Sequence, residues 1–326
     1  MTNLNDILNE HKIKCLNIKE KNYKQMQNVK KVDNFLLEEQ IGEGQFGKVY
    51  RASHVKTKEN FAVKVISKKM FKNNKLLKHQ LKRETVIMSG KKHANLMQMH
   101  RSFETSRNYY LVLDLCEGGD LSHFMRKNKI KHFEEAEATF ILKQIIQGFS
   151  ELQKRKVIHR DLKLENIFIK GTTIVLGDFG VAKVVKEMTS TTVGTPLNMA
   201  PEVMARDDYD SKSDIWSLGI VFFELLFGKA PFFALSIGEL RQIIQKKSGK
   251  NLNLKRYSHI CEDTKNLLRQ LLEPNPQKRI SWKNLFNHKI FSKNHCNSCG
   301  HYKKSNNSFF LNKFLKKKKS TPSSII

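Results

Sequence analysis

Four polar residues near the middle of the chain have the types and spacing that phosphoryl transfer requires. The segment 159–166 reads His-Arg-Asp-Leu-Lys-Leu-Glu-Asn, and Asp178-Phe179-Gly180 begins twelve residues after it ends. Asp161 has the chemistry of a general base and Lys163 that of a phosphate contact, while Asn166 and Asp178 offer the hard oxygen ligands that Mg²⁺ prefers. Because phosphoryl transfer depends mainly on positioning and charge neutralisation, these groups predict it if a nucleotide-binding element accompanies them.

A glycine-rich segment upstream is a candidate for that element. Residues 41–49 read Ile-Gly-Glu-Gly-Gln-Phe-Gly-Lys-Val, and glycines let backbone amides approach phosphate oxygens closely. Followed by a helix, the same spacing would indicate a dinucleotide-binding fold. Here strand-like residues lie on both sides, at 35–37 and 49–52, and no helical repeat follows Gly47. This pattern favours a β-hairpin over the dinucleotide-binding alternative.

A lysine and a glutamate farther along the chain are candidates for an ion pair at the nucleotide. Lys64 lies between apolar residues of an expected strand at 60–66, where a cation is costly to bury without an anionic partner. Glu84 lies in an apolar-periodic stretch that predicts a helix. Taken singly, each residue has a simpler alternative, a lysine that reaches solvent and a glutamate on a solvated helix face. Together with the glycine-rich segment they favour a nucleotide site.

In this order and spacing, the motifs resemble the eukaryotic protein kinase family over residues 33–291. Ala-Val-Lys at 62–64 and Ala-Pro-Glu at 200–202 join those already given. The resemblance implies an α+β, two-lobed protein kinase fold with a small N-lobe at about 33–113, formed by an antiparallel sheet and one regulatory helix. A hinge at about 114–119 and a larger, mainly helical C-lobe at about 120–291 would follow. We expect a flexible extension over 1–32 and a basic, disordered tail over 292–326.

The resemblance implies an ATP- and Mg²⁺-dependent enzyme that transfers the γ-phosphoryl group of ATP to protein hydroxyls. Asp161 would be the catalytic base, Lys163 would contact the γ-phosphate, and Asn166 and Asp178 would bind Mg²⁺. The residues expected around the nucleotide are Ile41, Gly42, Glu43, Gly44, Gln45, Phe46, Gly47, Lys48, Val49, Ala62, Lys64, Glu84, Leu113, Asp114, Cys116, Asp120 and Phe168.

Within that set, the resemblance assigns individual roles around adenine and ribose. Leu113 would be the gatekeeper, and backbone groups at Asp114 and Cys116 would bind adenine. Asp120 would contact the ribose, and Phe168 would line the floor beneath the base. A stacked apolar column is also implied, formed by Met88, Met99, His159 and Phe179.

Lys163 and Thr195 resemble the serine/threonine branch of the family, which implies a protein substrate with a serine or threonine acceptor. A cluster of hydroxyls lies between Asp178 and Glu202 and is expected to be regulatory when phosphorylated, with Arg160 as the receiver of the phosphate. Its alternative is a merely polar surface loop. The cluster consists of Thr189, Ser190, Thr191 and Thr192.

Four further assignments follow from the resemblance. Asp214 would brace the catalytic loop from a buried helix, and Glu202 would pair with Arg279. Residues 194–202, Gly-Thr-Pro-Leu-Asn-Met-Ala-Pro-Glu, are similar to the autophagy-initiating (unc-51-like) kinases, with the calcium/calmodulin-type branch as the alternative. Glu165 and Asp120 lie at positions where some family members bind basic residues of the substrate. We therefore expect a preference for substrates with basic residues near the acceptor.

Composition sets limits on the remaining possibilities. The chain has 326 residues, 39% of them hydrophobic, which is enough for one two-lobed catalytic domain. No apolar run approaches a membrane span, and the first ten residues lack a signal-peptide core. We therefore expect a cytoplasmic or nuclear protein that is neither secreted nor transmembrane, with a monomeric catalytic domain. The five cysteines fit a reducing compartment, although His295, Cys296, Cys299 and His301 leave a zinc site as an alternative to a metal-free tail.

The net charge of +28 indicates acidic partners. Residues 292–326 contain eight lysines and no acidic residue, so an acidic membrane surface or an acidic protein is expected to bind there. The alternative, which the high lysine content of the whole chain favours, is a solvated tail. No nucleic-acid recognition motif accompanies the charge, so we expect no specific nucleic acid. A non-catalytic pseudokinase is the other competing function, but it would normally lack Lys64, Asp161 or Asp178, and all three are present.

Overall fold

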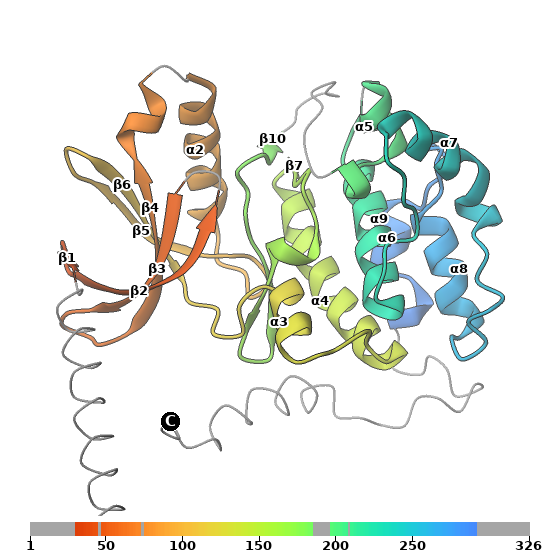
Figure 1. Ribbon diagram of the computed structural model, residues 1–326, viewed down its shortest axis with the longest axis horizontal. Coiled ribbons are helices and arrows are strands. Elements are labelled where there is room, and N and C mark those ends of the chain that lie inside the picture. The colour runs from red at the N-terminus through yellow and green to blue at the C-terminus, as the bar shows by residue number, and fades with distance from the viewer. Residues whose placement is uncertain (1–29, 45–46, 73–74, 185–195, 208, 292–326) are drawn as a thin grey trace, which may run out of the picture. The chain divides into compact units, whose positions relative to one another are not determined.

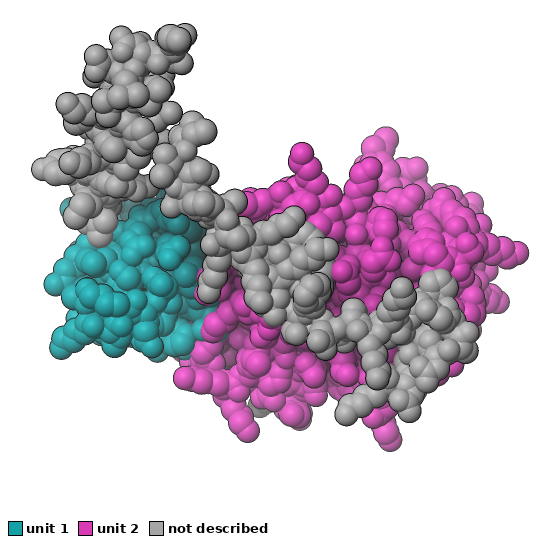
Figure 2. Space-filling view, turned by 90° about the horizontal axis from the view of Figure 1, so that it is seen from below, with its two compact units in different colours: residues 1–75, 99–115, 317–326 teal, residues 76–98, 116–316 magenta. Residues whose placement is uncertain are grey.

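The computed structural model describes residues 30–44, 47–72, 75–184, 196–207 and 209–291. The chain divides into two compact units, coloured separately in Figure 2. Of the described residues, the first unit holds 30–75 and 99–115, and the second holds 76–98 and 116–291. Among these residues, no helix is both long enough and apolar enough to cross a membrane. Gln45, Phe46, the hydroxyl cluster at 189–192 and the cysteine pair of the tail lie outside the described residues.

The first unit is built on one antiparallel sheet of six strands (Figure 1). Their spatial order is β1-β2-β3-β4-β6-β5. Alternating residues of the strands face a common apolar core, formed by Val32, Phe35, Leu37, Ala52, Val63, Tyr110 and Val112. The strands are β1 (Lys30–Val32), β2 (Phe35–Gly44), β3 (Gly47–His54), β4 (Asn60–Ser67), β5 (Met99–Glu104) and β6 (Asn108–Asp114), and a 3₁₀ turn, η1 (Lys68–Phe71), follows β4.

The glycine-rich segment forms the hairpin that the sequence predicts. β2 and β3 pair antiparallel, and Gly44 lies opposite Gly47 at the end of the pairing. In turn, β3 pairs with β4, which places Val49 opposite Lys64. Because β2 continues into a second strand and not into a helix, the dinucleotide-binding alternative is excluded.

The second unit is mainly helical. Its helices are α2 (Lys75–Met88), α3 (Leu121–Lys127), α4 (Glu135–Lys154), α5 (Pro201–Ala205), α6 (Lys212–Phe227), α7 (Ile237–Lys247), α8 (Glu262–Leu271) and α9 (Trp282–Phe286); the first residue of α2 groups with the sheet. The 3₁₀ turns are η2 (Leu164–Asn166), η3 (Pro196–Asn198), η4 (Gly249–Asn251) and η5 (Lys289–Phe291). Short strands are β7 (Val157–Ile158), β8 (Ile167–Lys170), β9 (Thr173–Leu176) and β10 (Lys183–Val184).

The core of the helical unit lies around α4 and α6. α6 is apolar on nearly all sides and contacts both α4 and α8. Such a pattern is typical of a helix that is buried all round. All three helices are labelled in Figure 1. Phe149 of α4 stacks on Trp282 of α9 with ring centroids 5.0 Å apart. The segment with the candidate catalytic residues runs between α4 and α6 in the chain.

Helix α2 groups with the helical unit, whereas the expected boundaries place it in the N-lobe. Its C-terminal end is bonded to the rest of that unit, because Arg155 at the end of α4 donates to the carbonyl oxygens of Ile87 and Lys91. The N–H of Met97 also donates to the carbonyl oxygen of Leu176 at 2.7 Å. The antiparallel sheet and the helical unit confirm the α+β fold class.

Candidate active site

A buried aspartate fixes the backbone of the candidate catalytic loop. Asp214, in the first turn of α6, is fully buried and accepts backbone N–H bonds from His159 at 2.8 Å and Arg160 at 2.9 Å. Burial raises the pKa of Asp214, against the opposing effect of His159 and of the two N–H donors. Arg160 has a φ of +70°, a left-handed conformation that is unfavourable for arginine and that these bonds help to hold. The predicted bracing role of Asp214 is confirmed.

Asp161, Lys163 and Asn166 meet at one carboxylate. The Nζ of Lys163 lies 2.9 Å from Oδ2 of Asp161. The side-chain Nδ2 of Asn166 donates to the same oxygen at 3.1 Å and to the backbone oxygen of Asp161 at 2.7 Å. Asn166 is buried, so its amide is held in place, while Asp161 and Lys163 are partly exposed. A carboxylate oriented in this way can accept a proton from an approaching hydroxyl.

Asp178 lies beside this group, because a short hairpin brings the two motifs together. β8 and β9 pair antiparallel with Ile167 opposite Leu176, and the N–H of Gly177 donates to the carbonyl of Asn166 at 3.0 Å. Asp178 follows directly, with a φ of +54° and an exposed side chain. A backbone hydrogen bond thus joins Asn166 to Gly177, the residue directly before Asp178.

The donor set fits Mg²⁺. Asn166 uses its amide nitrogen in the bonds to Asp161, which leaves its side-chain oxygen as the group for a metal. Asp178 adds an exposed carboxylate. Mg²⁺ is commonly held by one or two such oxygen ligands, with water and substrate phosphates completing its shell. Elsewhere in the described chain, no cluster of three or more histidine, cysteine or acidic residues offers a metal cage.

His159 and Phe179 form part of the predicted apolar column. Both are buried, with ring centroids 5.3 Å apart, and Nε2 of His159 lies 3.1 Å from the carbonyl oxygen of Gly177. Met88 is buried on α2 and Met99 on β5, in different units. The structure thus brings together the histidine and the phenylalanine, and the rest of the column stays a prediction.

The hairpin glycines differ in how much space the surrounding protein leaves for a side chain. A side chain at Gly47 would lie 2.1 Å from the backbone oxygen of Val65, so strand packing alone requires glycine there. A side chain at Gly42 would make one ordinary contact, with Val49, and one at Gly44 would meet no atom within 4 Å of the described protein. Because packing explains neither of these two glycines, the open space beside them fits the close approach of a phosphate. Nucleotide binding by this hairpin stays a prediction.

The remaining nucleotide-lining candidates are divided between the units. The first unit carries Ile41, Glu43 and Gly44 on β2, Lys48 on β3, Ala62 and Lys64 on β4, and Leu113 and Asp114 on β6. The second unit carries Glu84 on α2, followed by Cys116, Asp120 and Phe168. Glu84 is buried, with 2% of its surface exposed. Since Lys64 and Glu84 belong to different units, their ion pair stays a prediction.

Two candidates have structural contacts that the sequence did not predict. Asp120 caps α3, since its carboxylate accepts the N–H of His123 at 2.7 Å. The carboxylate of Asp114 lies 2.9 Å from Nε2 of His100. A cap of this type stabilises a helix by about 1 kcal/mol, so Asp120 has a role in folding whether or not it also contacts ribose.

Arg160, expected to receive a regulatory phosphate, is held at the edge of the loop. Its Nε donates to the carbonyl of Val181 at 2.6 Å, and one terminal nitrogen lies 3.5 Å from the hydroxyl of Tyr209. Because the hydroxyl cluster at 189–192 lies outside the described residues, its link to Arg160 stays a prediction.

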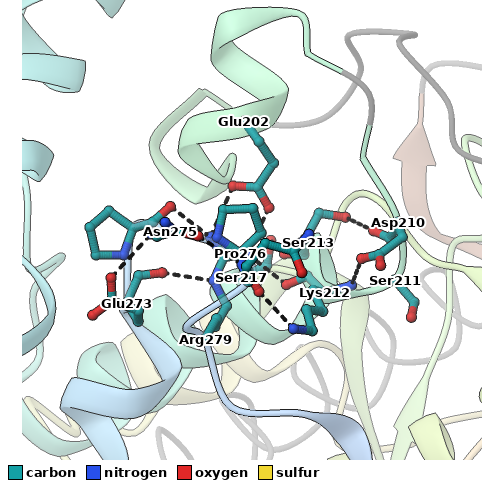
Figure 3. A network of polar contacts seen from close by, with 12 residues as sticks. Glu202, Asp210, Ser211, Lys212, Ser213, Ser217, Glu273, Asn275, Pro276 and Arg279 are labelled. Atoms are coloured by element: carbon teal, nitrogen blue, oxygen red, sulfur yellow. Dashed lines mark hydrogen bonds and ion pairs between the residues drawn. The ribbon is translucent and has the colours of Figure 1, made fainter.

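The predicted pair of Glu202 and Arg279 is confirmed, and Figure 3 shows its surroundings. The two side chains form a bidentate ion pair with N–O distances of 2.7 and 2.9 Å. The side chain of Arg279 is completely buried and also donates to the backbone oxygens of Lys212, Glu273 and Pro274. This network ties α5 to the start of α6 and to the segment before α9.

Sequence reasoning missed Asn198, which supports the catalytic loop. Its Nδ2 donates to the carbonyl of Leu162 at 3.2 Å, and its own carbonyl accepts the hydroxyl of Ser217 at 2.8 Å. Asn198 is buried, and its two hydrogen bonds connect the loop to α6. The available signal was a polar residue three positions before Pro201 in an otherwise apolar segment.

Sequence reasoning also gave Glu224 no role, although it is a charged residue in an apolar helix. Burial, reinforced by the negative charge of Glu165, raises the pKa of Glu224 to about 7. An unfolded glutamate titrates near pH 4.3. Between these two pH values the folded chain holds a proton that the unfolded chain has lost, so the free energy of unfolding falls as pH rises through this window.

We therefore expect Glu224→Gln to stabilise the protein in a pH-dependent way. The gain should be small near pH 4.5 and should reach on the order of 2 to 3 kcal/mol at pH 8, where the wild-type carboxylate is charged. Urea unfolding at several pH values measures this. Glu39→Gln, which changes an exposed glutamate of β2, is the control and should show no such trend. A gain that is independent of pH would show that Glu224 titrates normally.

The sheet with its glycine-rich hairpin and the helical unit with this catalytic loop are the two parts that define a protein kinase. The family description "Protein kinase domain" matches residues 35–291. The chain therefore belongs to the protein kinase family, which confirms the resemblance drawn from its motifs.

Individual relatives agree with this membership. The chain is 34% identical over 280 residues to "Serine/threonine-protein kinase atg1" of Dictyostelium discoideum, covering 83% of this chain and 41% of the relative. It is 37% identical over 260 residues to human "Hormonally up-regulated neu tumor-associated kinase", covering 78% and 36% of the two chains. "Serine/threonine-protein kinase ULK3" of Mus musculus is 34% identical over 264 residues, covering 79% and 55%. The chain thus spans between 36% and 55% of the length of these relatives.

Proposed function

We propose that the protein is an active serine/threonine kinase of the unc-51-like group that transfers the γ-phosphoryl group of ATP to protein hydroxyls. The observation that supports this best is the convergence of Lys163 and Asn166 on the carboxylate of Asp161. Asp178, next to Asn166 through the β8–β9 hairpin, completes the set. A pseudokinase would normally lack one of Lys64, Asp161 or Asp178, and this chain has all three.

Each residue has a task in the proposed reaction. Asp161 orients the acceptor hydroxyl and takes its proton as the phosphoryl group is transferred, and Lys163 balances the charge beside it. Asn166 and Asp178 hold Mg²⁺, and Asp214 keeps the loop backbone in register from below. ATP with Mg²⁺ supplies the transferable group and neutralises its charge. Positioning provides much of the rate enhancement in such a site.

A preference for basic residues near the acceptor is part of the proposal. Glu165 is exposed next to the catalytic triplet, and its charge influences Glu224. Two neighbouring carboxylates would repel each other less when a cation lies between them. Asp120, the other acidic residue expected to bind basic substrate residues, accepts the N–H of His123 as the cap of α3.

The basic segment 292–326 and the cellular setting complete the proposal. We infer that its eight lysines bind an acidic membrane surface or acidic protein, and that the kinase acts in the cytoplasm. Protein substrates with serine or threonine acceptors follow from the family.

The proposal predicts Mg²⁺-dependent phosphate transfer to serine and threonine in a peptide array, with no transfer to tyrosine. Asp178→Ala should lower the rate by at least about 100-fold, because it removes charge stabilisation from the transferred group. Asp207→Ala changes an exposed aspartate of the same unit and is the matched control. Wild-type protein that transfers no phosphate, or an Asp178→Ala variant as active as Asp207→Ala, would refute the proposal.

A further inference from the structure

A groove in the helical unit lies outside the catalytic group. It has a volume of about 680 Å³ and lies between α3, the end of α6 and the segment 129–132 that connects α3 to α4. Figure 1 shows this segment passing the C-terminal end of α6 before α4 begins. The volume is in the range of pockets that take small ligands or a few side chains. We call it the α3–α6 groove.

The wall formed by residues 129–132 is fixed by its backbone. The N–H of Ile130 donates to the carbonyl of Met125 at 2.9 Å, and the N–H of Phe133 donates to the carbonyl of Leu225 at 2.8 Å. Gly228 has a φ of +67°, and a side chain there would lie 2.1 Å from the backbone oxygen of Lys131. The segment therefore packs directly against the end of α6. A groove that is already formed loses little free energy to ordering when it binds a ligand.

The floor and the rim of the groove differ in chemistry. Met125, Ile130, Leu164 and Phe227 give it an apolar floor. On the rim, Arg126, Lys129 and Lys131 are exposed. A concave apolar floor with a charged rim is the usual anatomy of a site that anchors a bulky side chain and selects its flanking charges.

The rim cations are not neutralised within the part of the chain that the structure describes. No ion pair joins a described carboxylate to Arg126, Lys129 or Lys131, whereas other cations of the same unit are paired, such as Arg155 with Glu151. The acidic residue that follows the floor residue Leu164 is Glu165, and its charge acts on Glu224 of α6. The rim therefore presents three exposed cations that have no ion-pair partner among the described residues.

The chain's own charge argues against self-occupancy. Residues 292–326 hold eight lysines and no acidic residue, and residues 1–29 hold five lysines against three acidic residues. A second copy of the chain would bring a net charge of +28. Each of these would be repelled by a basic rim, so charge complementarity requires a different molecule. Nucleic acid would satisfy the rim but has no aliphatic side chain for the floor, and a flat membrane surface does not fill a concave groove.

We propose that the α3–α6 groove is a docking site for an acidic segment of a partner protein that carries bulky apolar side chains. The apolar side chains fill the floor, and flanking aspartate or glutamate residues meet the three rim cations. Docking of this kind raises the local concentration of a bound partner and needs no phosphoryl transfer, so it is independent of the proposed catalytic activity.

The test uses the full chain and a fluorescein-labelled peptide in which Leu-Ser-Phe is flanked by three glutamates on each side. Fluorescence anisotropy should show saturable binding, and the triple variant Arg126→Glu, Lys129→Glu, Lys131→Glu should weaken it at least tenfold. The matched control is Arg241→Glu, Lys246→Glu, Lys250→Glu, which makes the same charge change at exposed positions on and after α7 and should alter binding less than twofold. Circular dichroism checks that both variants are folded.

Two further arms separate docking from general charge attraction. A peptide with serine in place of leucine and phenylalanine should bind at least tenfold more weakly to the wild-type chain. A peptide with lysines in place of the glutamates should gain affinity for the groove variant, which a misfolded variant would not show. The proposal would be overturned if both triple variants lost the same affinity or if the serine peptide bound as well as the original peptide. It would also be overturned if single-stranded DNA or anionic vesicles competed more strongly than unlabelled peptide, or if the peptide did not bind at 1 mM.

Discussion

Changing Asp161 to asparagine should lower kcat for phosphoryl transfer by roughly 10²- to 10⁴-fold, the range expected for loss of a general base. The substitution keeps the size of the side chain and one oxygen that can accept from Asn166 or Lys163, so the loop should keep its shape. What it removes is the negative charge and the basicity that a departing proton needs. Because Asp161 is assigned to the hydroxyl and not to the nucleotide, KM for ATP should change by less than about threefold.

Steady-state kinetics with wild-type protein, Asp161→Asn and the surface control Asp207→Asn measure this. The thermal unfolding midpoint of each variant shows whether any loss reflects damage to the fold. If Asp161→Asn kept more than one fifth of the wild-type kcat, the assignment of the base would be wrong. If KM for ATP rose together with the loss in kcat, the aspartate would act on the nucleotide.

Glu202→Gln should destabilise the protein by about 3 to 5 kcal/mol, because it leaves the guanidinium of Arg279 buried without a counter-charge. The pair is bidentate, and Arg279 lies among three backbone oxygens that cannot replace a carboxylate (Figure 3). The loss is a large fraction of the 5 to 15 kcal/mol typical of a folded protein. Urea unfolding followed by tryptophan fluorescence is a suitable measurement, since Trp216 lies 5.3 Å from the guanidinium.

A double-mutant cycle separates the ion pair from packing. Glu202→Leu with Arg279→Met removes both charges, so it should destabilise less than the sum of the two single changes. Some loss should remain, because the backbone oxygens of Lys212, Glu273 and Pro274 then lose their donor. Additive effects would show that the two side chains act independently, in contradiction to the buried pair.

The contacts that local motifs specify were predictable from the sequence. Asp161, Lys163 and Asn166 lie within six consecutive residues, and the β8–β9 hairpin that brings Asp178 beside Asn166 is equally local. Asp214 and Glu202 were assigned through the family resemblance, which supplies the long-range partner that spacing alone does not. The family, the α+β fold and the glycine-rich hairpin were also predictable, because the motifs that indicate them are local in the sequence.

Features made by distant segments were not predictable. The α3–α6 groove is formed by residues 122–132, Leu164 and residues 227–228, which share no periodic pattern. Its wall depends on a left-handed conformation at Lys129, which has a φ of +55°. Lysine is not a residue type that indicates such a turn. The raised pKa of Glu224 likewise depends on its burial in the folded chain and, to a lesser degree, on the charge of Glu165, far away in the sequence. The ion pair of Lys64 and Glu84 remains a prediction, because the two residues belong to different units.

The most direct test of the central claim is calorimetric titration of the full chain with ATP in the presence of Mg²⁺. The proposed activity requires that Lys64 and Asp178, both expected from the family resemblance to lie at the nucleotide, act on the same ATP. We predict one bound ATP per chain. Lys64→Met should reduce the affinity for ATP about 10- to 100-fold, because it removes a charge-assisted contact. Asp178→Ala should also reduce this affinity, because it removes a ligand of the Mg²⁺ that accompanies ATP. Undiminished affinity in both Lys64→Met and Asp178→Ala, or no ATP binding by the wild-type chain, would contradict the account.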